Sequence, residues 1–118
     1  GVDGVVIFRN HSNLEDIVTG NASNTDGTST EVIAAAAAGI KQYLTSCTLI
    51  NMSATGIYVE LKSGTTVRWR FPLPANGGVT HTWDPPLPPN AAAEAWNFDP
   101  SAAVTTAFCS LNGFKSKV

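Results

Sequence analysis

The side chains best suited to acid–base or metal chemistry are the two histidines, His11 and His81. Histidine exchanges protons near neutral pH and is a common metal ligand. His81 alternates in line with Val79 and Trp83, which is typical of a packed or half-exposed side chain, and His11 lies in a polar segment typical of solvent. A zinc site usually takes three or four ligands. Two histidines at unrelated positions therefore predict no metal centre.

Carboxylate pairs and activated serines are the other groups that could do chemistry. A glycosidase needs two carboxylates across its substrate, but Asp84 and Asp99 each precede a proline, which is typical of turns. Glu94 opens an expected strand. The sequence has no Gly-x-Ser-x-Gly motif for a serine nucleophile. We therefore expect no enzyme activity, no cofactor and no metal.

The three tryptophans are candidates for a binding platform, because flat rings anchor ligands and protein partners. Trp69 lies on the apolar face of an alternating strand and Trp96 shares a face with Phe98, so both are expected in the core. Trp83 borders a proline-rich segment and is expected to be exposed. There it would serve as a ligand platform or as an interface anchor.

The arginines and the N-terminal apolar run supply further candidates for contact with a partner. Arg68 and Arg70 point outward from their strand beside Tyr58, where they either pair with a partner's carboxylates or form a solvated face. The run that ends at Phe8 suits a strand or a docking arm. The candidate interface residues are Val5, Ile7, Phe8, Tyr58, Arg68, Arg70, His81 and Trp83.

The elements that position these residues are short strands. Apolar residues alternate with polar ones in 57–62 and 67–71, and a glycine turn separates the two runs, which predicts a hairpin. Similar runs and turn signals along the chain predict seven to nine strands in a single antiparallel, jelly-roll-like β-sandwich. The expected core residues are Tyr43, Leu49, Ile57, Val59, Leu61, Val67, Trp69, Phe71, Trp96, Phe98 and Leu111.

The N-terminal quarter differs in composition from the rest. From Thr19 to Thr30 it is almost entirely Gly, Asn, Ser, Thr and Asp, and such a segment has little apolar surface to offset its ordering entropy. We therefore divide the chain into an N-terminal arm and polar linker, 1–29, and a β-sandwich domain, 30–118. An ordinary first strand followed by a long surface loop is the alternative.

Composition limits the classes of partner. Charged residues make up 14% of the 118 residues and the net charge is -2, without the basic stripe that nucleic-acid binding requires. No apolar run approaches the ~18 residues that cross a bilayer. We expect no nucleic acid and no membrane partner.

The two cysteines, Cys47 and Cys109, have no metal-site spacing. They are either two buried thiols or one disulfide, which would stabilise the fold by about 4 kcal/mol in the chain-entropy model. Both interpretations stay open.

Four stretches resemble small β-sandwich virion proteins of tailed bacteriophages, of the capsid-decorating or cementing kind. They are VIAAAAAG at 32–39, KSGTT at 62–66, PANGG at 74–78 and EAWNFDPSAA at 94–103. The resemblance implies a homo-oligomer or array on the capsid surface that binds the major capsid protein or another virion protein. The alternative is a receptor- or carbohydrate-binding domain of a tail fibre or spike, or another tail or neck component.

Overall fold

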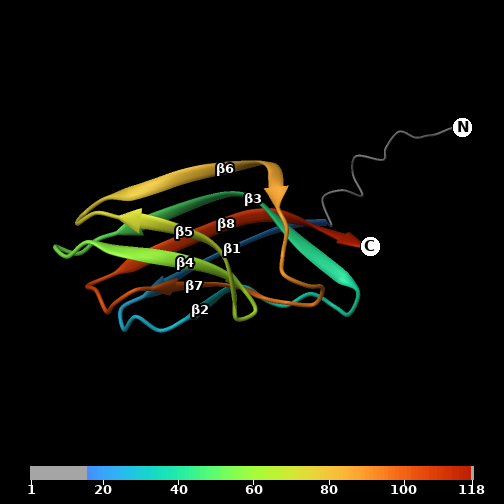
Figure 1. Cartoon of the computed structure of the whole chain (residues 1–118), viewed down its shortest axis with the longest axis horizontal. Coiled ribbons are helices and arrows are strands. Elements are labelled where there is room, and N and C mark those ends of the chain that lie inside the picture. Colours follow the sequence, from blue (N-terminus) through green and yellow to red (C-terminus); the bar gives the residue numbers. More distant parts are fainter. Residues whose placement is uncertain (1–15, 118) are drawn as a thin grey trace, which may run out of the picture.

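The chain folds into two stacked sheets of four strands each (Figure 1). The structure is a computed structural model and describes residues 16–117. All eight elements are strands: β1 (Ile17–Asn24), β2 (Thr30–Ile33), β3 (Ile40–Asn51), β4 (Ile57–Ser63), β5 (Thr66–Leu73), β6 (Gly78–Leu87), β7 (Trp96–Pro100) and β8 (Ala107–Lys117).

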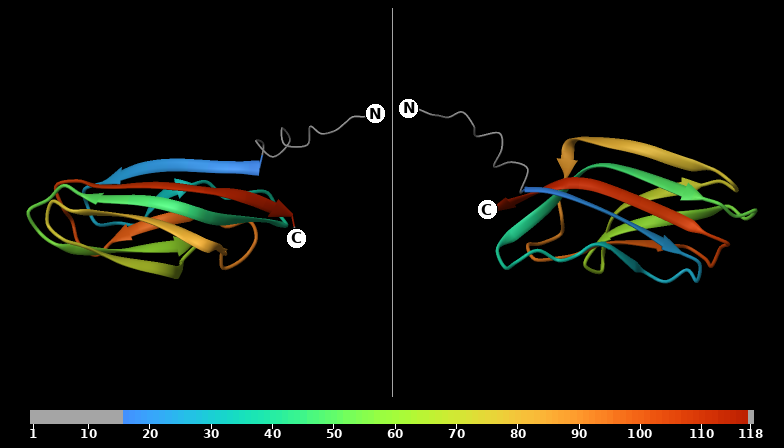
Figure 2. Two further views of the ribbon diagram at one scale, coloured as in Figure 1. Left: turned by 90° about the horizontal axis from the view of Figure 1, so that it is seen from above. Right: turned by 180° about the vertical axis from the view of Figure 1, so that it is seen from behind.

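The strand order is that of one long hairpin rolled up on itself. Sheet A has the order β1-β8-β3-β6 and sheet B the order β2-β7-β4-β5. Strand β1 pairs with β8, β2 with β7, β3 with β6 and β4 with β5, all antiparallel. The pairings of β3 with β8 and of β4 with β7 join these pairs into the two four-stranded sheets. This is a jelly roll, so the expected all-β sandwich is confirmed, and Figure 2 shows its two layers from the side.

The hairpin expected from the alternating pattern is β4–β5. Ser63 faces Thr66 at its turn, and Ile57 faces Leu73 at its open end. Gly64 occupies the turn with φ +61°, a conformation that side chains with a Cβ rarely adopt. The turn glycine and the period-two pattern together fix the register of this pair.

The core lies between the sheets. Among the residues expected there, the following are buried: Leu49, Ile57, Val59, Leu61, Phe71, Trp96, Phe98 and Leu111. Trp96 is fully buried, and its Nε1 donates a hydrogen bond to the carbonyl oxygen of Gln42 at 2.8 Å. The indole therefore links sheet B to sheet A while it satisfies its one polar group.

Two residues of β5 that we expected in the core are exposed. Val67 and Trp69 keep 40% and 37% of their accessible surface. Val67 pairs with outward-facing Lys62, because the register shifts at Arg68, so it lies on the outer face of the sheet. Trp69 lies on the same face of the strand as buried Phe71, but β5 is the edge strand of sheet B. Inward-facing side chains at an edge are covered incompletely, because the facing sheet ends there.

Tyr43 is also outside the core, where it is half-buried and stacks on Phe114 with ring centroids 5.3 Å apart. The register between β3 and β8 shifts between Leu44 and Ser46, so Thr45 is an extra residue in a β-bulge. A bulge reverses which residues of the strand face inward. Tyr43 therefore faces away from the core although it alternates in sequence with Cys47.

Part of the expected polar linker is a strand. Strand β1 pairs with β8 over its whole length, from Ile17 opposite Phe114 to Asn24 opposite Ala107. The turn that follows is held by buried Asn24, whose Nδ2 donates to the carbonyl oxygen of Thr28 at 2.7 Å. β1 is an edge strand, so its backbone pairs on one side only. Its hydrogen bonds to β8 stabilise it although it carries few apolar side chains. The candidate interface residues Val5, Ile7 and Phe8 lie outside the described residues.

The cysteines are free and buried. Cys47 lies opposite Leu111 and Cys109 opposite Leu49 on the adjacent strands β3 and β8. Burial raises the pKa of both thiols, to about 11 for Cys47. Of the two interpretations of the cysteines, a disulfide or two buried thiols, the structure shows two buried thiols.

Gly113→Ala tests the close approach of β8 to β3. A Cβ at position 113 would lie 1.9 Å from the carbonyl oxygen of Tyr43, whereas one at Gly56 would meet nothing closer than 3.7 Å. We expect Gly113→Ala to lower the free energy of unfolding by about 3 kcal/mol, because the clash is with backbone, and Gly56→Ala to be nearly neutral. Urea denaturation measures both, and equal effects would contradict the register of these strands.

Thiol reactivity tests the burial of the cysteines. At pH 8 we expect neither thiol to react with an alkylating reagent until the protein unfolds, because only the exposed thiolate attacks. The ordinary thiol pKa is 9.0 and that of folded Cys47 is about 11, so the folded state binds its proton more tightly. Stability should then fall as pH rises from 9 to 11, and less steeply in Cys47→Ala. Rapid labelling of the folded protein would refute this placement.

Candidate interaction surfaces

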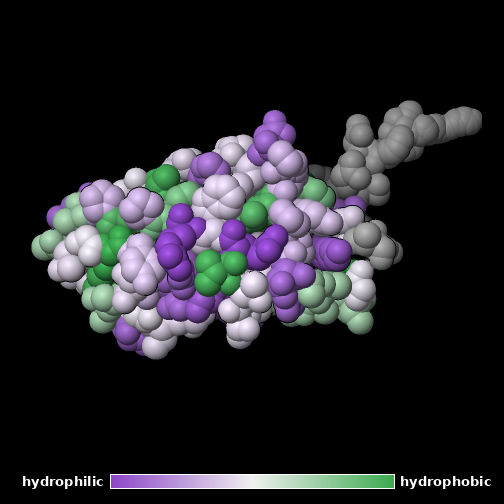
Figure 3. Space-filling view, in the orientation of Figure 1, coloured by the Kyte–Doolittle hydropathy of each residue, from purple (hydrophilic) through white to green (hydrophobic). Residues whose placement is uncertain are grey.

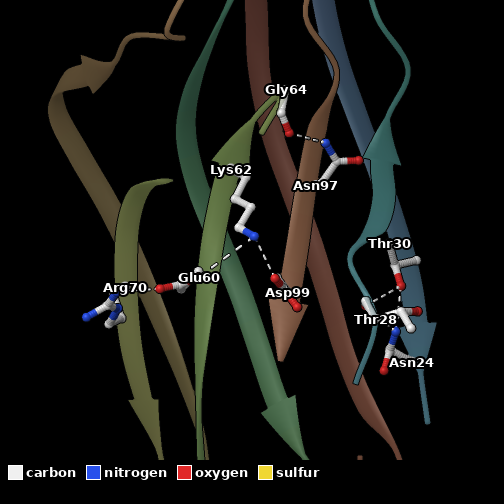
Figure 4. A network of polar contacts seen from close by, with 9 residues as sticks. All are labelled: Asn24, Thr28, Thr30, Glu60, Lys62, Gly64, Arg70, Asn97 and Asp99. Atoms are coloured by element: carbon white, nitrogen blue, oxygen red, sulfur yellow. Dashed lines mark hydrogen bonds and ion pairs between the residues drawn. The ribbon is translucent and has the colours of Figure 1, made fainter. Parts of the chain in front are cut away.

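The outer face of sheet B carries a row of paired charges, which we name the charge ladder: Arg70, Glu60, Lys62 and Asp99 (Figure 4). Arg70 pairs with Glu60, and Lys62 Nζ lies 2.6 Å from Asp99 Oδ2 and 4.0 Å from Glu60 Oε1. The hydrogen bond with Asp99 raises the pKa of Lys62. Two cations and two anions offset one another, so this face presents little net charge to a partner.

Tyr58 and Arg70, both candidate interface residues, belong to this face. The Arg70 guanidinium carbon lies 5.2 Å from the centroid of the Tyr58 ring, and Tyr58 is 45% exposed. Hydrophilic residues gather over β4 and β5 in the space-filling view (Figure 3). Arg70 therefore has its carboxylate and its aromatic neighbour within its own chain.

Arg68 is separated from Arg70 by a register shift. Leu61 faces Trp69 and Lys62 faces Val67, so Arg68 is the unpaired residue of a bulge. Its Nε donates a hydrogen bond to the carbonyl oxygen of Pro88 at 3.2 Å. The two arginines thus do not form one site, and Arg68 holds the proline-rich segment against β5.

An aromatic groove opens between the edge strands β5 and β6. We use this name for the groove of about 470 Å³ lined by Trp69, His81, Thr82, Trp83 and residues 84–88. The ring centroid of Trp69 lies 5.5 Å from that of His81 and 5.8 Å from that of Trp83, and His81 and Trp83 are 5.1 Å apart. The structure thus brings two candidate interface residues, His81 and Trp83, together with Trp69.

The two tryptophans of the groove exchange their expected roles. Trp83, expected to be exposed, keeps only 6% of its surface, while Trp69, expected in the core, keeps 37%. Trp83 packs nearly perpendicular to Trp69, at 86°. Its buried Nε1 has no hydrogen-bond partner among residues 16–117, which is uncommon for a buried donor. Trp69 is therefore the open ring of the groove.

The central part of the outer face of sheet A carries no charged side chain, and we name it the neutral face. Strand register aligns its polar side chains in two rows across β1, β8, β3 and β6. The first row is Thr19, Asn112, Ser46 and Thr82, and the second is Asn21, Ser110, Thr48 and Thr80. In the first row Thr19 Oγ1 donates to Asn112 Oδ1 at 2.9 Å, and Asn112 Nδ2 donates to Ser46 Oγ at 3.2 Å.

Apolar residues border both ends of the neutral face. Ile17, Phe114 and Tyr43 pair across the strands at one end, and Phe108 and Ile50 at the other. Ile17 is 55% exposed and Ile50 is 38% exposed. Read along the strands, the four rows are apolar, polar, polar and apolar.

The sequence carries one signal for the neutral face. The central residues of the sheet A strands come from four stretches without Asp, Glu, Lys or Arg: 17–25, 42–59, 71–83 and 100–114. Which strands share a sheet depends on contacts between distant segments. The uncharged stretches by themselves do not reveal that they lie side by side.

Within residues 16–117, no three or more His, Cys, Asp or Glu side chains gather where they could hold a metal ion. The same residues include no helix with the length and apolar character that crossing a membrane takes.

Comparison with known proteins finds likeness in fold alone. No protein-family model and no curated protein matches the sequence. The capsid structure of Helicobacter pylori bacteriophage KHP30 is similar with a TM-score of 0.56 and 9% identity, over 87% of this chain and 94% of that one. PirA is similar with a TM-score of 0.52 and 12% identity, over 80% of this chain and 92% of that one.

A third similar structure is the insecticidal delta-endotoxin Cry8Ea1 from Bacillus thuringiensis. It has a TM-score of 0.49 and 8% identity, over 81% of this chain but only 19% of the toxin chain. The two structures with TM-scores above 0.5 share the fold of this chain. At such low identities a shared fold does not show a shared function.

Trp96→Ala and Trp69→Ala form a matched pair that tests the groove. Trp96 is fully buried and hydrogen-bonded, so its loss should lower the free energy of unfolding by about 3–5 kcal/mol. Trp69 is partly exposed, and its loss should cost about 1 kcal/mol through its aromatic contacts. Urea denaturation followed by circular dichroism distinguishes them. Equal losses would show that Trp69 belongs to the core after all.

Proposed function

We propose that this chain is a non-enzymatic structural protein of a virion that docks on other protein surfaces through its neutral face. The observation that carries the proposal is the uncharged outer surface of four adjacent strands. Interface centres are depleted of charged residues, because burying an unpaired charge costs several kcal/mol. Ser, Thr and Asn side chains can be buried at little cost when a partner supplies hydrogen bonds.

The virion setting is supported by the fold and by the resemblance in sequence. The jelly roll is similar to the capsid structure of bacteriophage KHP30, and the four quoted stretches resemble phage decoration proteins. The role we favour is a decoration or cement protein on the capsid surface, with the major capsid protein or another virion protein as its partner. Its contribution is to bind across coat subunits and stabilise their lattice.

The neutral face also supports contact between copies of the chain. Along the strands the rows run apolar, polar, polar and apolar, and this order is the same from either end. A two-fold axis between two copies can therefore place the apolar rows of one copy against apolar rows of the other. Four strands about 4.8 Å apart and six residue steps of about 3.4 Å give a flat area of roughly 400 Å². That is about half of a standard interface per partner. Pairing is then weak for two copies and stronger in an array through avidity.

A receptor- or carbohydrate-binding domain of a tail fibre or spike is the second candidate. The observation that favours it is the aromatic groove, where Trp69 offers an open ring beside the carboxylate of Asp84. This role calls for a ligand in the groove, whereas a coat, tail or neck component calls for protein on the neutral face. The two surfaces meet at β6, where Thr82 belongs to both, but Thr48 and Trp69 belong to one surface each and can be altered separately.

Thr48→Glu tests docking through the neutral face. Thr48 lies in the second polar row, and a carboxylate there would be buried unpaired in the contact. In purified particles, quantitative mass spectrometry should give the wild-type chain in numbers comparable with the major coat protein. We expect Thr48→Glu to reduce this ratio about tenfold or more.

Thr66→Glu is the matched control, because Thr66 is exposed on β5 of sheet B. This variant should assemble like the wild type. A handful of wild-type copies per particle would refute the cement role. Equal incorporation of both variants would refute the neutral face as the docking surface.

A further inference from the structure

The aromatic groove combines features of a ligand site that docking through the neutral face does not use. We propose that it binds a neutral pyranose sugar, stacked on the open face of Trp69. The inference deepens the second candidate role and holds independently of the neutral face. It rests on three observations: a fixed open ring, hydrogen-bonding groups around it, and a lining that disfavours other ligands.

Trp69 is a ring held in one orientation. It is 37% exposed, and three aromatic neighbours contact it from the interior: Phe71 at 6.4 Å, His81 at 5.5 Å and Trp83 at 5.8 Å between centroids. The face of an aromatic ring carries partial negative charge. The C–H groups on one side of a pyranose carry partial positive charge, so the two flat surfaces attract. A ring already fixed loses little entropy when a sugar stacks on it.

Polar groups of both kinds surround this ring. Asp84, exposed on β6, supplies a carboxylate that accepts hydrogen bonds, and Thr82 supplies a hydroxyl. Trp83 Nε1 is a buried donor without a partner in the described chain. Sugar hydroxyls both donate and accept. A pyranose in the groove can therefore donate a hydrogen bond to Asp84 and exchange one with the Thr82 hydroxyl.

The lining disfavours anionic ligands and extended peptides. Its described residues include no lysine or arginine that would attract an anion. Pro85, Pro86 and Pro88 have no backbone N–H, so a peptide cannot add to β6 as a further strand there. Polyproline recognition uses grooves lined by exposed aromatic rings, whereas here Trp83 is buried and stands at 86° to Trp69.

Titration with the methyl glycosides of glucose, galactose, mannose and N-acetylglucosamine tests the proposal. The readout is the NMR signal of each indole N–H in the full chain. We expect at least one glycoside to bind with a roughly millimolar dissociation constant and to shift the signals of Trp69 and Trp83 but not of Trp96. Trp69→Ala should weaken binding about tenfold or more, and Asp84→Asn should weaken it several-fold.

Two controls separate this site from the other surfaces. Tyr58→Ala removes an exposed ring from the outer face of sheet B, and it should bind the sugar like the wild type. Thr48→Glu should also bind normally, so failure of docking and failure of sugar binding are distinguishable. The proposal is overturned if no glycoside shifts the groove tryptophans up to about 50 mM, far above a millimolar dissociation constant. It is equally overturned if Trp69→Ala binds unchanged, or if a proline-rich peptide binds and no sugar does.

Discussion

The pairing of β3 with β8 is the interaction on which the rest of the structure depends. These are the two longest strands, and they join the middle of the chain to its C-terminal end from Ile40 opposite Lys117 to Asn51 opposite Ala107. They form the centre of sheet A and carry β6 and β1 on their outer edges. Their inner residues supply much of the core and their outer residues most of the neutral face. The strands approach so closely at Gly113 that no side chain fits there.

The two sheets carry outer surfaces of different character. Sheet B carries the charge ladder on its outer face, where opposite charges offset one another. Sheet A offers an uncharged face of matching rows, and the aromatic groove lies where the two sheets end side by side at β5 and β6. Strand β6 contributes to both surfaces, because Thr82 lies in the first polar row of the neutral face and also lines the groove.

Local pattern predicted the fold well where it was undisturbed. The buried residues of β4, β7 and β8 follow a strict period of two, and their inward residues were identified correctly, whereas the register of β5 shifts at Arg68 and turns Val67 outward. The errors arise at irregularities. The bulge at Thr45 turned Tyr43 outward, and the edge position of β5 left Trp69 open. Strand β1 was missed because its polar composition is typical of a loop, whereas its pairing with β8 supplies the hydrogen bonds that stabilise it.

The sequence by itself determined the class of the fold, the positions of most strands and the inward side of each regular one. These depend on the alternation of neighbouring residues and on turn glycines and prolines, which act over a few positions. Only the tertiary structure decided which uncharged strands lie together and which tryptophan, Trp69 or Trp83, faces the open groove. Both outcomes depend on pairings between segments far apart in the chain, such as β1 with β8, and on where each sheet ends. No local pattern contains that information, because it arises only when the hairpin rolls up.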